Sequence, residues 1–570
     1  MKITEHLSAP FLTLDDHELE STLKHWDTTP WVMDTETDGL EVIGPYSKNK
    51  AYWIGLLPTV GNALPIVISR SQFLRVVKPF IPKMALIGHN LRFDLHALGI
   101  PEKPSSMWDT QIWQYHNSTS SRKSLDFLAA ARGWSKIATP DELKQGRILE
   151  LNDRILGHYL ADDCITTLRL FKEQNGRPVK PWLINTDFPL ELTLQKMEER
   201  GVILDIPRLH GVETKVEDLV KNLKEHLVQM GFDGNLGSSK QLAKWLHENG
   251  RDLPYTPKGN PSTDKQTLMK LADKGDTFCK HLLEWRRMTK LLQAFFRPLP
   301  NLCVRGKLHA NINSARTVTG RFSYNSPNLQ QIPKPKEDAY SLGKELRKCI
   351  SHEGGVSVAD YSQVELRVAA ALSNEPVLLE AFAAGADPHK ETAAAVFKIK
   401  PENVTKEQRH MAKTVNFGIL FGAGPNRLSN ELKISIEEAR RVFRDYKTGM
   451  AGLSEWCDTE WAEMEISHVA KTASDRTRIF GANESTRPGL SVVIQGTASE
   501  LMRAALINVE KAGLKPILSV HDEIVTKGKG NGEELAEIMK ESAEKAFPEL
   551  LSVVEFPADG EEGNSWGELE

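Results

Sequence analysis

The sequence lacks several features that mark particular classes of protein. Its five cysteines are scattered over 570 residues without a C-x-x-C pair, which argues against structural zinc and against a disulfide framework. No apolar run approaches the roughly 18 residues that a membrane span requires. Residues 1–13 also lack the basic, apolar and small-residue order of a signal peptide. We therefore expect a cytoplasmic protein with reduced thiols and no membrane contact.

The sequence also lacks a surplus of basic residues. A formal net charge of −4 gives no global sign of nucleic-acid binding, so any surface for DNA has to be a local basic track. We find no internal repeat or low-complexity tract. The length favours about three or four domains, and a hydrophobic content of 40% is enough for substantial cores.

The most informative stretch is VSVADYSQVELR at residues 356–367. Valines alternating with small residues predict a strand that ends at Asp360. Ser362 and Glu365 have the spacing of a capping box, which predicts a helix through Leu372. An aspartate at the end of a strand is, by itself, more often a turn or cap residue than a ligand.

A second acidic stretch lies at residues 516–526, which read as two short strands around a tight turn. The turn carries Asp522 and Glu523, whose charges repel and are tolerated most easily beside a cation. A solvated acidic turn is the alternative. If Asp360 and Asp522 end neighbouring strands, their oxygens form a site for two Mg²⁺ ions, which suits in-line phosphoryl transfer.

Residues 405–422 predict a helix that opens with a capping box at Thr405 and Gln408. Four residues recur at intervals of four and share one face of this helix: Arg409, Lys413, Phe417 and Phe421. Two cations followed by two rings can bind phosphates and then pack on sugar and base. A basic edge on an ordinary amphipathic helix explains the cations but not their order.

Together these stretches resemble the polymerase motifs of family A DNA polymerases. The resemblance extends to residues 319–333, 387–397 and 495–506. It implies that Asp360, Asp522 and the Tyr361 carbonyl hold the metals, with Glu523 beside them. The nucleotide contacts that it implies are Gln363, Glu365, His389, Arg409, Lys413, Phe417, Phe421, Arg487 and Gln495. The DNA contacts that it implies are Arg286, Arg287, Lys290, Arg321, Asn328, Gln330 and His521.

Another set of acidic residues lies in the first third of the chain. Asp34 and Glu36 are two apart in a predicted strand, so they share one sheet face. Asp94 falls within the first turn or so of a predicted helix. Tyr159 and Asp163 are four apart on one face of another helix. Each fragment taken alone has an ordinary explanation as a cap or a solvated face.

The turn before Asp94 offers Asn90 as the helix cap. In this order, the three fragments resemble a DEDD-type 3′–5′ exonuclease domain in its tyrosine-bearing form. The resemblance implies that the four carboxylates hold two metals while the Tyr159 hydroxyl orients the attacking water.

We therefore expect an α/β multidomain protein, with a ribonuclease H-like 3′–5′ exonuclease domain followed by a right-hand polymerase of palm, thumb and fingers. The expected divisions are residues 1–180 for the exonuclease, 181–300 for the start of the palm and the thumb, 301–375 for the palm with the first metal-binding carboxylate, 376–485 for the fingers and 486–570 for the palm with the second. Asp34 lies too near the start of the sequence for a preceding 5′-nuclease domain. By analogy this favours a replicative, phage-encoded enzyme.

The expected function is a template-directed DNA polymerase that adds dNTPs to a primer 3′ end and proofreads with a 3′–5′ exonuclease. We expect two Mg²⁺ ions per active site, with Mn²⁺ as a substitute, and a monomer that binds primer-template DNA. Glu365 at the family's sugar-gate position disfavours a single-subunit RNA polymerase. Intact acidic residues disfavour an inactive scaffold, and the complete second half disfavours a nuclease alone.

The sequence departs from the family pattern at Phe421, where most relatives carry a tyrosine whose hydroxyl can hydrogen-bond the gate glutamate. Without that donor, Glu365 has spare acceptor capacity near the minor-groove edge of the nascent base pair. The distinctive donor in that groove is a purine 2-amino group. We hypothesise a preference for 2-amino purines such as 2-aminoadenine opposite thymine. The alternative is a neutral loss of one hydroxyl.

Overall fold

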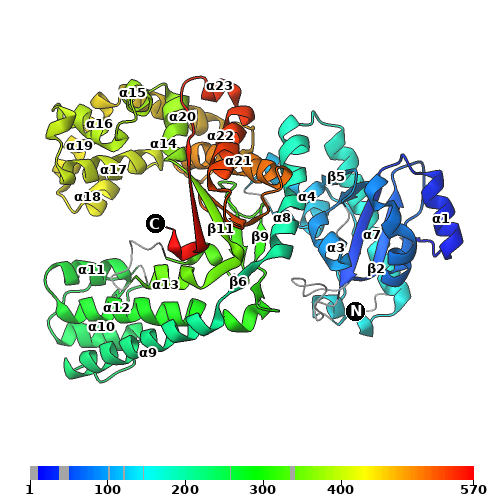
Figure 1. Cartoon of the computed structure of the whole chain (residues 1–570), viewed down its shortest axis with the longest axis horizontal. Helices are drawn as coiled ribbons and strands as arrows, with labels where there is room; N and C mark the ends of the chain where they lie inside the picture. Colours follow the sequence, from blue (N-terminus) through cyan, green and yellow to red (C-terminus); the bar gives the residue numbers. More distant parts are fainter. Residues whose placement is uncertain are drawn as a thin grey trace. The chain divides into compact units, whose positions relative to one another are not determined.

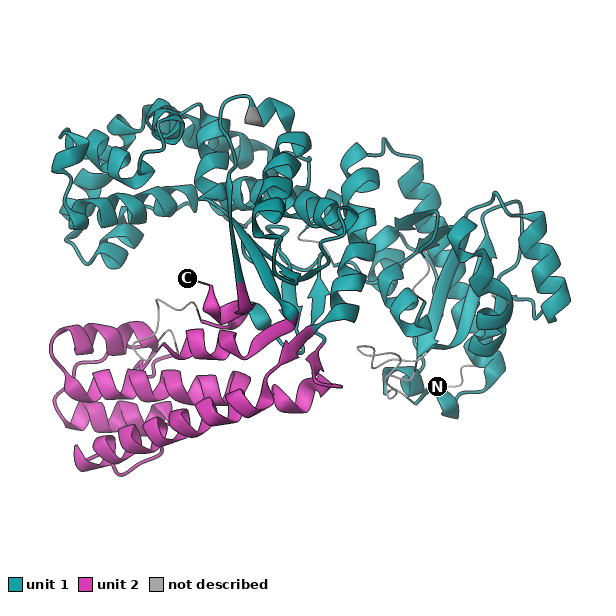
Figure 2. Cartoon of the chain, viewed as in Figure 1, with its two compact units in different colours: residues 1–201, 309–330, 354–562 teal, residues 202–308, 331–353, 563–570 magenta. Residues whose placement is uncertain are grey.

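The computed structural model describes residues 10–37, 51–100, 103–119, 122–145, 147–256, 258–333 and 341–569. The chain folds into two compact units. Unit 1 contains residues 1–201, 309–330 and 354–562, and unit 2 contains residues 202–308, 331–353 and 563–570 (Figure 2). Both contain helices and strands, which confirms the predicted α/β class. The finer domain boundaries stay predictions.

The first part of unit 1 is built on a five-stranded sheet of order β3-β2-β1-β4-β5 (Figure 1). Its strands are β1 Trp31–Thr37, β2 Ala51–Pro58, β3 Ile66–Ser69, β4 Ala85–Gly88 and β5 Ser106–Asp109. Strand β1 pairs antiparallel with β2 and parallel with β4. The α-helices of this part, apart from the three-residue turn α2, are α1 Asp16–His25, α3 Leu91–Leu98, α4 Thr110–Asn117, α5 Leu125–Ala130, α6 Asp141–Lys144 and α7 Asp153–Asn175.

Side chains of β1 alternate between the two faces of the sheet. Met33 belongs to a buried cluster that also contains residues of α1, whereas Val32 belongs to a second cluster together with Cys164 of α7. By the same alternation Asp34 and Glu36 lie on the face that α7 covers. The predicted strand and its acidic face are therefore confirmed.

Helix α7 lies close to the sheet because β2 carries a glycine opposite Asp34. Gly55 pairs with Asp34 in the β1–β2 register. A Cβ at Gly55 would lie 2.7 Å from Cys164 Sγ and 3.0 Å from Leu160 Cγ, so any side chain would push the helix away. The close approach brings Asp163, on the same helix, up to β1.

The second part of unit 1 contains the other predicted motifs. Strand β11, Ile350–Tyr361, pairs antiparallel with β15, Glu523–Lys527, which pairs with β14, Pro516–Val520. The predicted hairpin is thus confirmed. The helices of this part are α8 Phe188–Arg200, α14 Val364–Ser373, α15 Pro376–Ala383, α16 Pro388–Phe397, α17 Lys406–Leu420, α18 Pro425–Leu432, α19 Ile436–Gly449, α20 Ala451–Ser467, α21 Gly489–Lys511, α22 Gly532–Ala546 and α23 Pro548–Leu551. The remaining strands are β9 Asn311–Asn313, β10 Ser323–Asn325, β12 Val469–Lys471, β13 Thr477–Ile479 and β16 Ala558–Ser565.

Helix α21 is the core helix of this part. Within the described ranges it is the one helix long and apolar enough to cross a membrane by length and composition, so the expectation that no stretch of the sequence approaches this limit is wrong. Its most apolar stretch is, however, 83% buried inside the protein. Such burial is expected of a helix that is hydrophobic all round and packs inside a large domain.

Unit 2 is mostly helical. Its helices are α9 Ile206–Gln229, α10 Ser239–Glu248, α11 Lys265–Asp273, α12 Thr277–Leu291 and α13 Leu342–Lys348, and its short strands are β6 Val202–Leu204, β7 Cys303–Val304 and β8 Lys307–Leu308. Leu242, Leu268 and Phe278 are fully buried in its core. Within this unit β6 pairs with β8 and with the first residues of β11.

A buried cluster of charges joins the two parts of unit 1. His116 Nδ1 of α4 donates to Asp187 Oδ2 at 2.8 Å, and Arg503 Nη1 of α21 donates to Asp187 Oδ1 at 3.0 Å. Arg476 lies 3.7 Å from Asp187 and 3.3 Å from Glu500. Burial alone would raise the pKa of Asp187, but Arg476, Arg503 and His116 outweigh it and hold that pKa well below its usual range.

Replacing Asp187 with asparagine should destabilise unit 1 by about 3–5 kcal/mol, because the buried guanidinium groups of Arg476 and Arg503 then lose a countercharge that they share. The folded pKa is lowered, so the stabilisation is fully present above the unfolded-state pKa of about 4 and is lost as the pH falls. Urea unfolding should therefore show a difference in the free energy of unfolding between the wild type and Asp187→Asn at pH 7. This difference should begin to decrease below about pH 4.

The matched control for this prediction is Asp16→Asn. It breaks an exposed ion pair with Arg75, whose side chains are 49% and 58% accessible. This change should cost less than about 1 kcal/mol. Equal losses in the two variants would contradict the role of the buried cluster.

Candidate active sites

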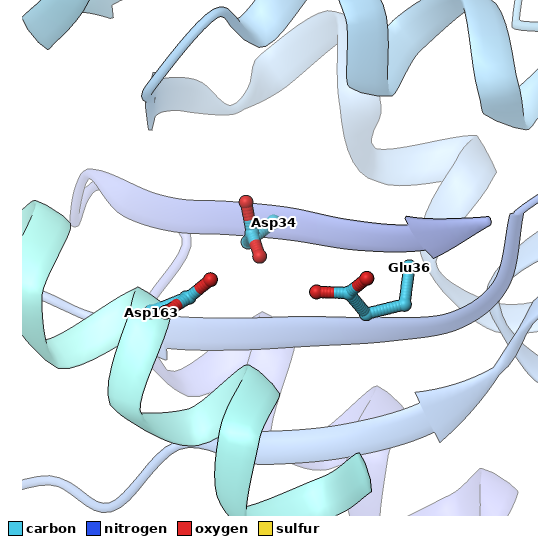
Figure 3. Close-up of side chains that lie close together, drawn as sticks. All are labelled: Asp34, Glu36 and Asp163. Carbon is cyan, nitrogen blue, oxygen red and sulfur yellow. The ribbon is translucent and has the colours of Figure 1, made fainter. Parts of the chain in front are cut away.

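Three acidic side chains meet between β1 and α7. One carboxylate oxygen from each of Asp34, Glu36 and Asp163 lies within 4.8 Å of the others (Figure 3). Carboxylates at this spacing are the usual ligands of hard divalent cations such as Mg²⁺. The residues that the sequence predicts as metal ligands are therefore brought together here.

Asp94, the fourth predicted ligand, lies in the first turn of α3. Thr35 Oγ1 donates to its Oδ1 at 2.8 Å, whereas its Oδ2 is buried with no hydrogen-bond partner among the described residues. An unpartnered buried carboxylate oxygen beside other carboxylates fits a metal ligand. The donor set of this site therefore fits a divalent cation.

The prediction that Asn90 caps α3 with its side chain is wrong. Asn90 occupies the cap position in the left-handed conformation and makes no side-chain cap bond. The Asp109 carboxylate instead accepts from the backbone nitrogens of Asn90 and Leu91. Asp109 follows 19 residues later at the end of β5, so local spacing could not reveal it.

Burial, together with mutual repulsion, shapes the charge of this acidic site. Burial, and then the neighbouring carboxylates, raise the pKa values of Asp34, Glu36 and Asp94 well above their usual range. Burial raises the pKa of Asp163 to about 6 against the opposing effect of Lys136. Buried, mutually repelling carboxylates are a common mark of a functional site, and a divalent cation would relieve their repulsion.

The polymerase carboxylates lie where β11 and the hairpin end together. Asp360 pairs with Glu523 in the β11–β15 register, and the Tyr361 N–H donates to the Asp522 carbonyl at 3.1 Å. His521, also in the turn, has a left-handed φ of 56°. The expected position of Asp360 and Asp522 at neighbouring strand ends is confirmed. Their role as metal ligands stays a prediction.

The predicted capping box at Ser362 and Glu365 is wrong. Helix α14 does begin near there, at Val364, but Gln363 precedes it in the left-handed conformation and no side chain caps it. The Glu365 carboxylate instead accepts a hydrogen bond from Arg321 Nη2. Burial raises the pKa of Glu365, with Arg321 lowering it and Asp522 raising it. Arg321, which the sequence predicts to contact DNA, therefore contacts Glu365, which the sequence predicts to contact the nucleotide.

Helix α17 has the predicted capping box, with Thr405 and Gln408 exchanging hydrogen bonds. Its face borders a cleft of about 300 Å³, lined by His410, Lys413, Thr414, Phe417, Gly418, Phe421, Arg427 and Glu431. The Phe417 and Phe421 ring centroids are 5.9 Å apart. Arg409 does not line this cleft, because its guanidinium pairs with Asp387. The four-residue pattern thus identifies three of the eight lining residues. It misses His410, Thr414 and Gly418 on α17 itself, and Arg427 and Glu431 on α18.

His389 lies beside this face, with its ring centroid 5.8 Å from that of Phe417. Burial lowers the pKa of His389 to about 4, with Lys413 and Arg409 also lowering it and Asp387 opposing them. Asn416 Nδ2 lies 3.3 Å from His389 Nδ1, and Asn416 Oδ1 accepts from the Tyr446 hydroxyl at 2.6 Å. A neutral imidazole that accepts at Nδ1 carries its proton on Nε2, so His389 is a donor at that atom.

The remaining predicted contacts lie at several places. Arg286, Arg287 and Lys290 lie on α12 of unit 2, where Arg286 Nη1 donates to the Thr263 carbonyl at 2.6 Å and Lys290 is exposed. In unit 1, Gln330 Nε2 donates to the Ser519 carbonyl at 3.4 Å, and Asn328 is half-buried. Arg487 is exposed just before α21, and Gln495 is half-buried on it. Their roles toward DNA or nucleotide stay predictions.

Comparison with known proteins identifies both parts of the chain. The family described as "DNA polymerase family A" matches residues 207–568, and the one described as "3'-5' exonuclease" matches residues 13–174. The thermostable DNA polymerase I of Thermus thermophilus is 33% identical over 403 residues, which cover 66% of this chain and 48% of that protein. The chain spans about half the length of this protein and of two other thermostable DNA polymerase I proteins of Thermus.

Two further relatives match nearly the whole chain. DNA polymerase I of Aquifex aeolicus is 28% identical over 593 residues, covering 96% of this chain and 98% of that protein. Among solved structures, the POL domain of Pol1 from M. smegmatis, in complex with DNA primer-template and dNTP, is 25% identical with a TM-score of 0.83. It covers 98% of this chain and 100% of its own. The predicted order of an exonuclease domain and then a polymerase domain is confirmed, and the chain belongs to DNA polymerase family A.

Proposed function

We propose that the protein is a template-directed DNA polymerase that extends a primer 3′ end with dNTPs and removes nucleotides from that end with a 3′–5′ exonuclease. The observation that supports this most is the presence of two separate acidic sites. One is the cluster of Asp34, Glu36 and Asp163, and the other is the pair Asp360 and Asp522 at adjoining strand ends. The relative from M. smegmatis, solved with primer-template and dNTP, supports the same ligands here.

Both sites have the oxygen donors that Mg²⁺ prefers, and we propose two ions in each, with Mn²⁺ as a substitute. Asp34, Glu36, Asp94 and Asp163 would hold them in the exonuclease site. Asp360, Asp522 and the Tyr361 carbonyl would hold them in the polymerase site, with Glu523 adjacent. Bound there, divalent ions supply Lewis-acid stabilisation of the charge that develops on the phosphoryl oxygens.

The chain's own residues would bind and orient the substrates. Lys413, exposed on the cleft, is suited to the phosphates of an incoming dNTP, and His389, whose ring lies beside that of Phe417, has an Nε2–H suited to donate to the same ligand. Phe417 offers a ring on which the sugar can pack. In the exonuclease site, the Tyr159 hydroxyl is suited to orient the attacking water.

A primer-template assay with dNTPs, with rNTPs or without nucleotides tests this function. We expect extension with dNTPs, little extension with rNTPs, and shortening of the primer without nucleotides. Extension that is equally efficient with rNTPs would indicate an RNA polymerase. Neither extension nor shortening would indicate a binding protein.

We also propose a monomeric, cytoplasmic, replicative enzyme of phage origin. All five cysteines are free, which is consistent with a reducing compartment. A proofreading site in the same chain as the polymerase suits replication, and phage origin rests on analogy. Light scattering of the purified chain should give a mass near 63.9 kDa, and twice that value would reject the monomer.

A finer proposal concerns the choice of base. Phe421 has no hydroxyl, and Arg321 engages Oε1 of Glu365, so Oε2 is the oxygen available to a minor-groove donor. A hydrogen bond to a charged acceptor contributes about 1.5–3 kcal/mol, or roughly ten- to a hundredfold in full. We expect 2-aminoadenine triphosphate to outcompete dATP opposite thymine.

Competition kinetics in a proofreading-deficient background measure this preference, and Phe421→Tyr is the decisive variant. The added hydroxyl should compete for Glu365 and reduce the preference. Equal use of the two nucleotides, or a preference that the hydroxyl leaves unchanged, would show that Phe421 is only a packing variant.

A further inference from the structure

A short irregular segment, residues 136–139, packs along the face of α7 that carries Tyr159 and Asp163. It lies between α5 and α6. The Ile137 N–H donates to Asp162 Oδ2 at 2.8 Å, which fixes the backbone of the segment to the helix. Side chains on either side of Ile137 then reach the two functional residues of α7.

Lys136 is the buried cation of this segment. Its Nζ lies 2.6 Å from Asp163 Oδ1 and 2.8 Å from Asp126 Oδ1, while its side chain is only 6% exposed. The contact with Asp163 is an ion pair without an aligned hydrogen bond. A lysine is seldom buried this fully unless its charge serves a fixed partner.

Tyr159 is held from two sides by the same segment. Lys136 Nζ lies 4.7 Å from its ring centroid, within the range of a cation–π contact. The Thr139 and Tyr159 hydroxyl oxygens are 3.1 Å apart. Lys136, at one end of the segment, thus holds the Tyr159 ring, and Thr139, at the other end, holds the Tyr159 hydroxyl.

We propose that Lys136 is a positioning residue of the exonuclease site, which holds the Asp163 carboxylate and the Tyr159 ring and whose charge limits how tightly the adjoining carboxylates bind a divalent cation. This inference rests on the proposed exonuclease function. Residues that orient metal ligands typically change activity or metal affinity by about 10–100-fold when replaced. Here the effects of Lys136 on activity and on metal affinity have opposite signs. Its contacts with Asp163 and Tyr159 support catalysis, whereas its positive charge repels a metal ion.

Lys136→Met should therefore lower the exonuclease kcat about 10–100-fold. It should also lower the Mn²⁺ concentration for half-saturation at least about threefold, because a like charge beside the carboxylates is gone. A residue that only maintained the fold would, when replaced, loosen metal binding as well as lower kcat. The direction of the change in Mn²⁺ affinity thus distinguishes positioning from general damage.

The experiment uses the full chain with Asp360→Asn and Asp522→Asn, so that the polymerase carboxylates contribute little to metal binding. Free Mn²⁺ is followed by electron paramagnetic resonance without substrate, and degradation of a single-stranded oligonucleotide gives kcat. Two further variants separate charge from contact. Lys136→Arg keeps the charge and should keep wild-type Mn²⁺ affinity with partial recovery of kcat. Thr139→Val removes the hydroxyl contacts with Tyr159 and Asp126 but no charge, and it should lower kcat without changing Mn²⁺ affinity.

Lys144→Met is the matched control, because this lysine pairs with Asp141 on the surface, with side chains 57% and 79% exposed. This variant should change neither the exonuclease kcat nor the Mn²⁺ affinity. An unchanged kcat or a weaker Mn²⁺ affinity in Lys136→Met would overturn the inference. If Lys136→Met does not fold, Lys136→Gln takes its place because it also removes the charge, and an unchanged kcat or a weaker Mn²⁺ affinity in that variant overturns the inference. A wild-type chain that binds Mn²⁺ but does not shorten DNA would reject the exonuclease function and the inference with it.

Discussion

Replacing Asp360 or Asp522 with asparagine should reduce primer extension about 10³-fold or more, the loss expected when a metal-assisted step forfeits several kcal/mol. Asparagine keeps the shape of the side chain but removes a negative ligand. The N–H of Tyr361, the residue after Asp360, donates to the Asp522 carbonyl. The two aspartates therefore lie side by side, and either change weakens the same site. Extension rates on a matched primer with Mg²⁺ measure the effect.

Degradation of a single-stranded primer should persist in both variants, because the exonuclease carboxylates lie on β1, α3 and α7. Asp458→Asn is a suitable control, since this aspartate pairs with Lys447 at the surface and is 53% exposed. Loss of both activities in a folded variant would reject the assignment of separate sites.

The converse change, Asp34→Ala with Glu36→Ala, should abolish nucleotide-free shortening of a primer, again by about 10³-fold or more. It removes two of the three carboxylates whose oxygens lie within 4.8 Å of one another. The remaining Asp163 already pairs with Lys136 and is left without a second metal ligand on β1. Gel analysis of a labelled primer over time measures the loss.

Extension with dNTPs should continue in this variant. Glu20→Ala serves as the control, because Glu20 is exposed on α1 and pairs with Lys24 there. Continued shortening at the wild-type rate would contradict the exonuclease assignment.

The sequence predicts those parts of the sites that depend on neighbours within one element. Asp34 and Glu36 share a sheet face because strand side chains alternate. The capping box at Thr405 and Gln408 forms because both partners lie in one turn. The Pro516–Val520 strand and its partner form a hairpin because turn and strands are contiguous.

Distant partners account for the errors. Ser362 and Glu365 have the right spacing for a cap, but Arg321, 44 residues away, binds the glutamate. Asn90 has the right residue type, but Asp109 at the end of another strand makes the bonds. Neither competitor is visible in the local pattern, because tertiary contacts override local preference.

Lys136 and Gly55 show what the sequence cannot reveal. A lone lysine in an irregular segment has no periodicity, and only the fold brings it to 2.6 Å from Asp163. Gly55 looks like an ordinary interruption of a strand, yet its missing side chain admits α7. Both act through packing of segments that are far apart in the chain.

The buried charges around Asp187 also bear on how this protein can be divided by truncation. A fragment that began after residue 180 would keep Asp187 and Arg503 but lose His116, and with it a partner of the carboxylate. It would also lose Tyr115, whose hydroxyl donates to the Thr317 carbonyl at 2.7 Å and whose ring lies 5.7 Å from the Arg476 guanidinium. Water would then reach a charge cluster arranged for a dry interior. The polymerase half alone is therefore expected to be less stable than the same residues in the whole chain. A stable fragment would require redesign of the surface that the exonuclease half now covers.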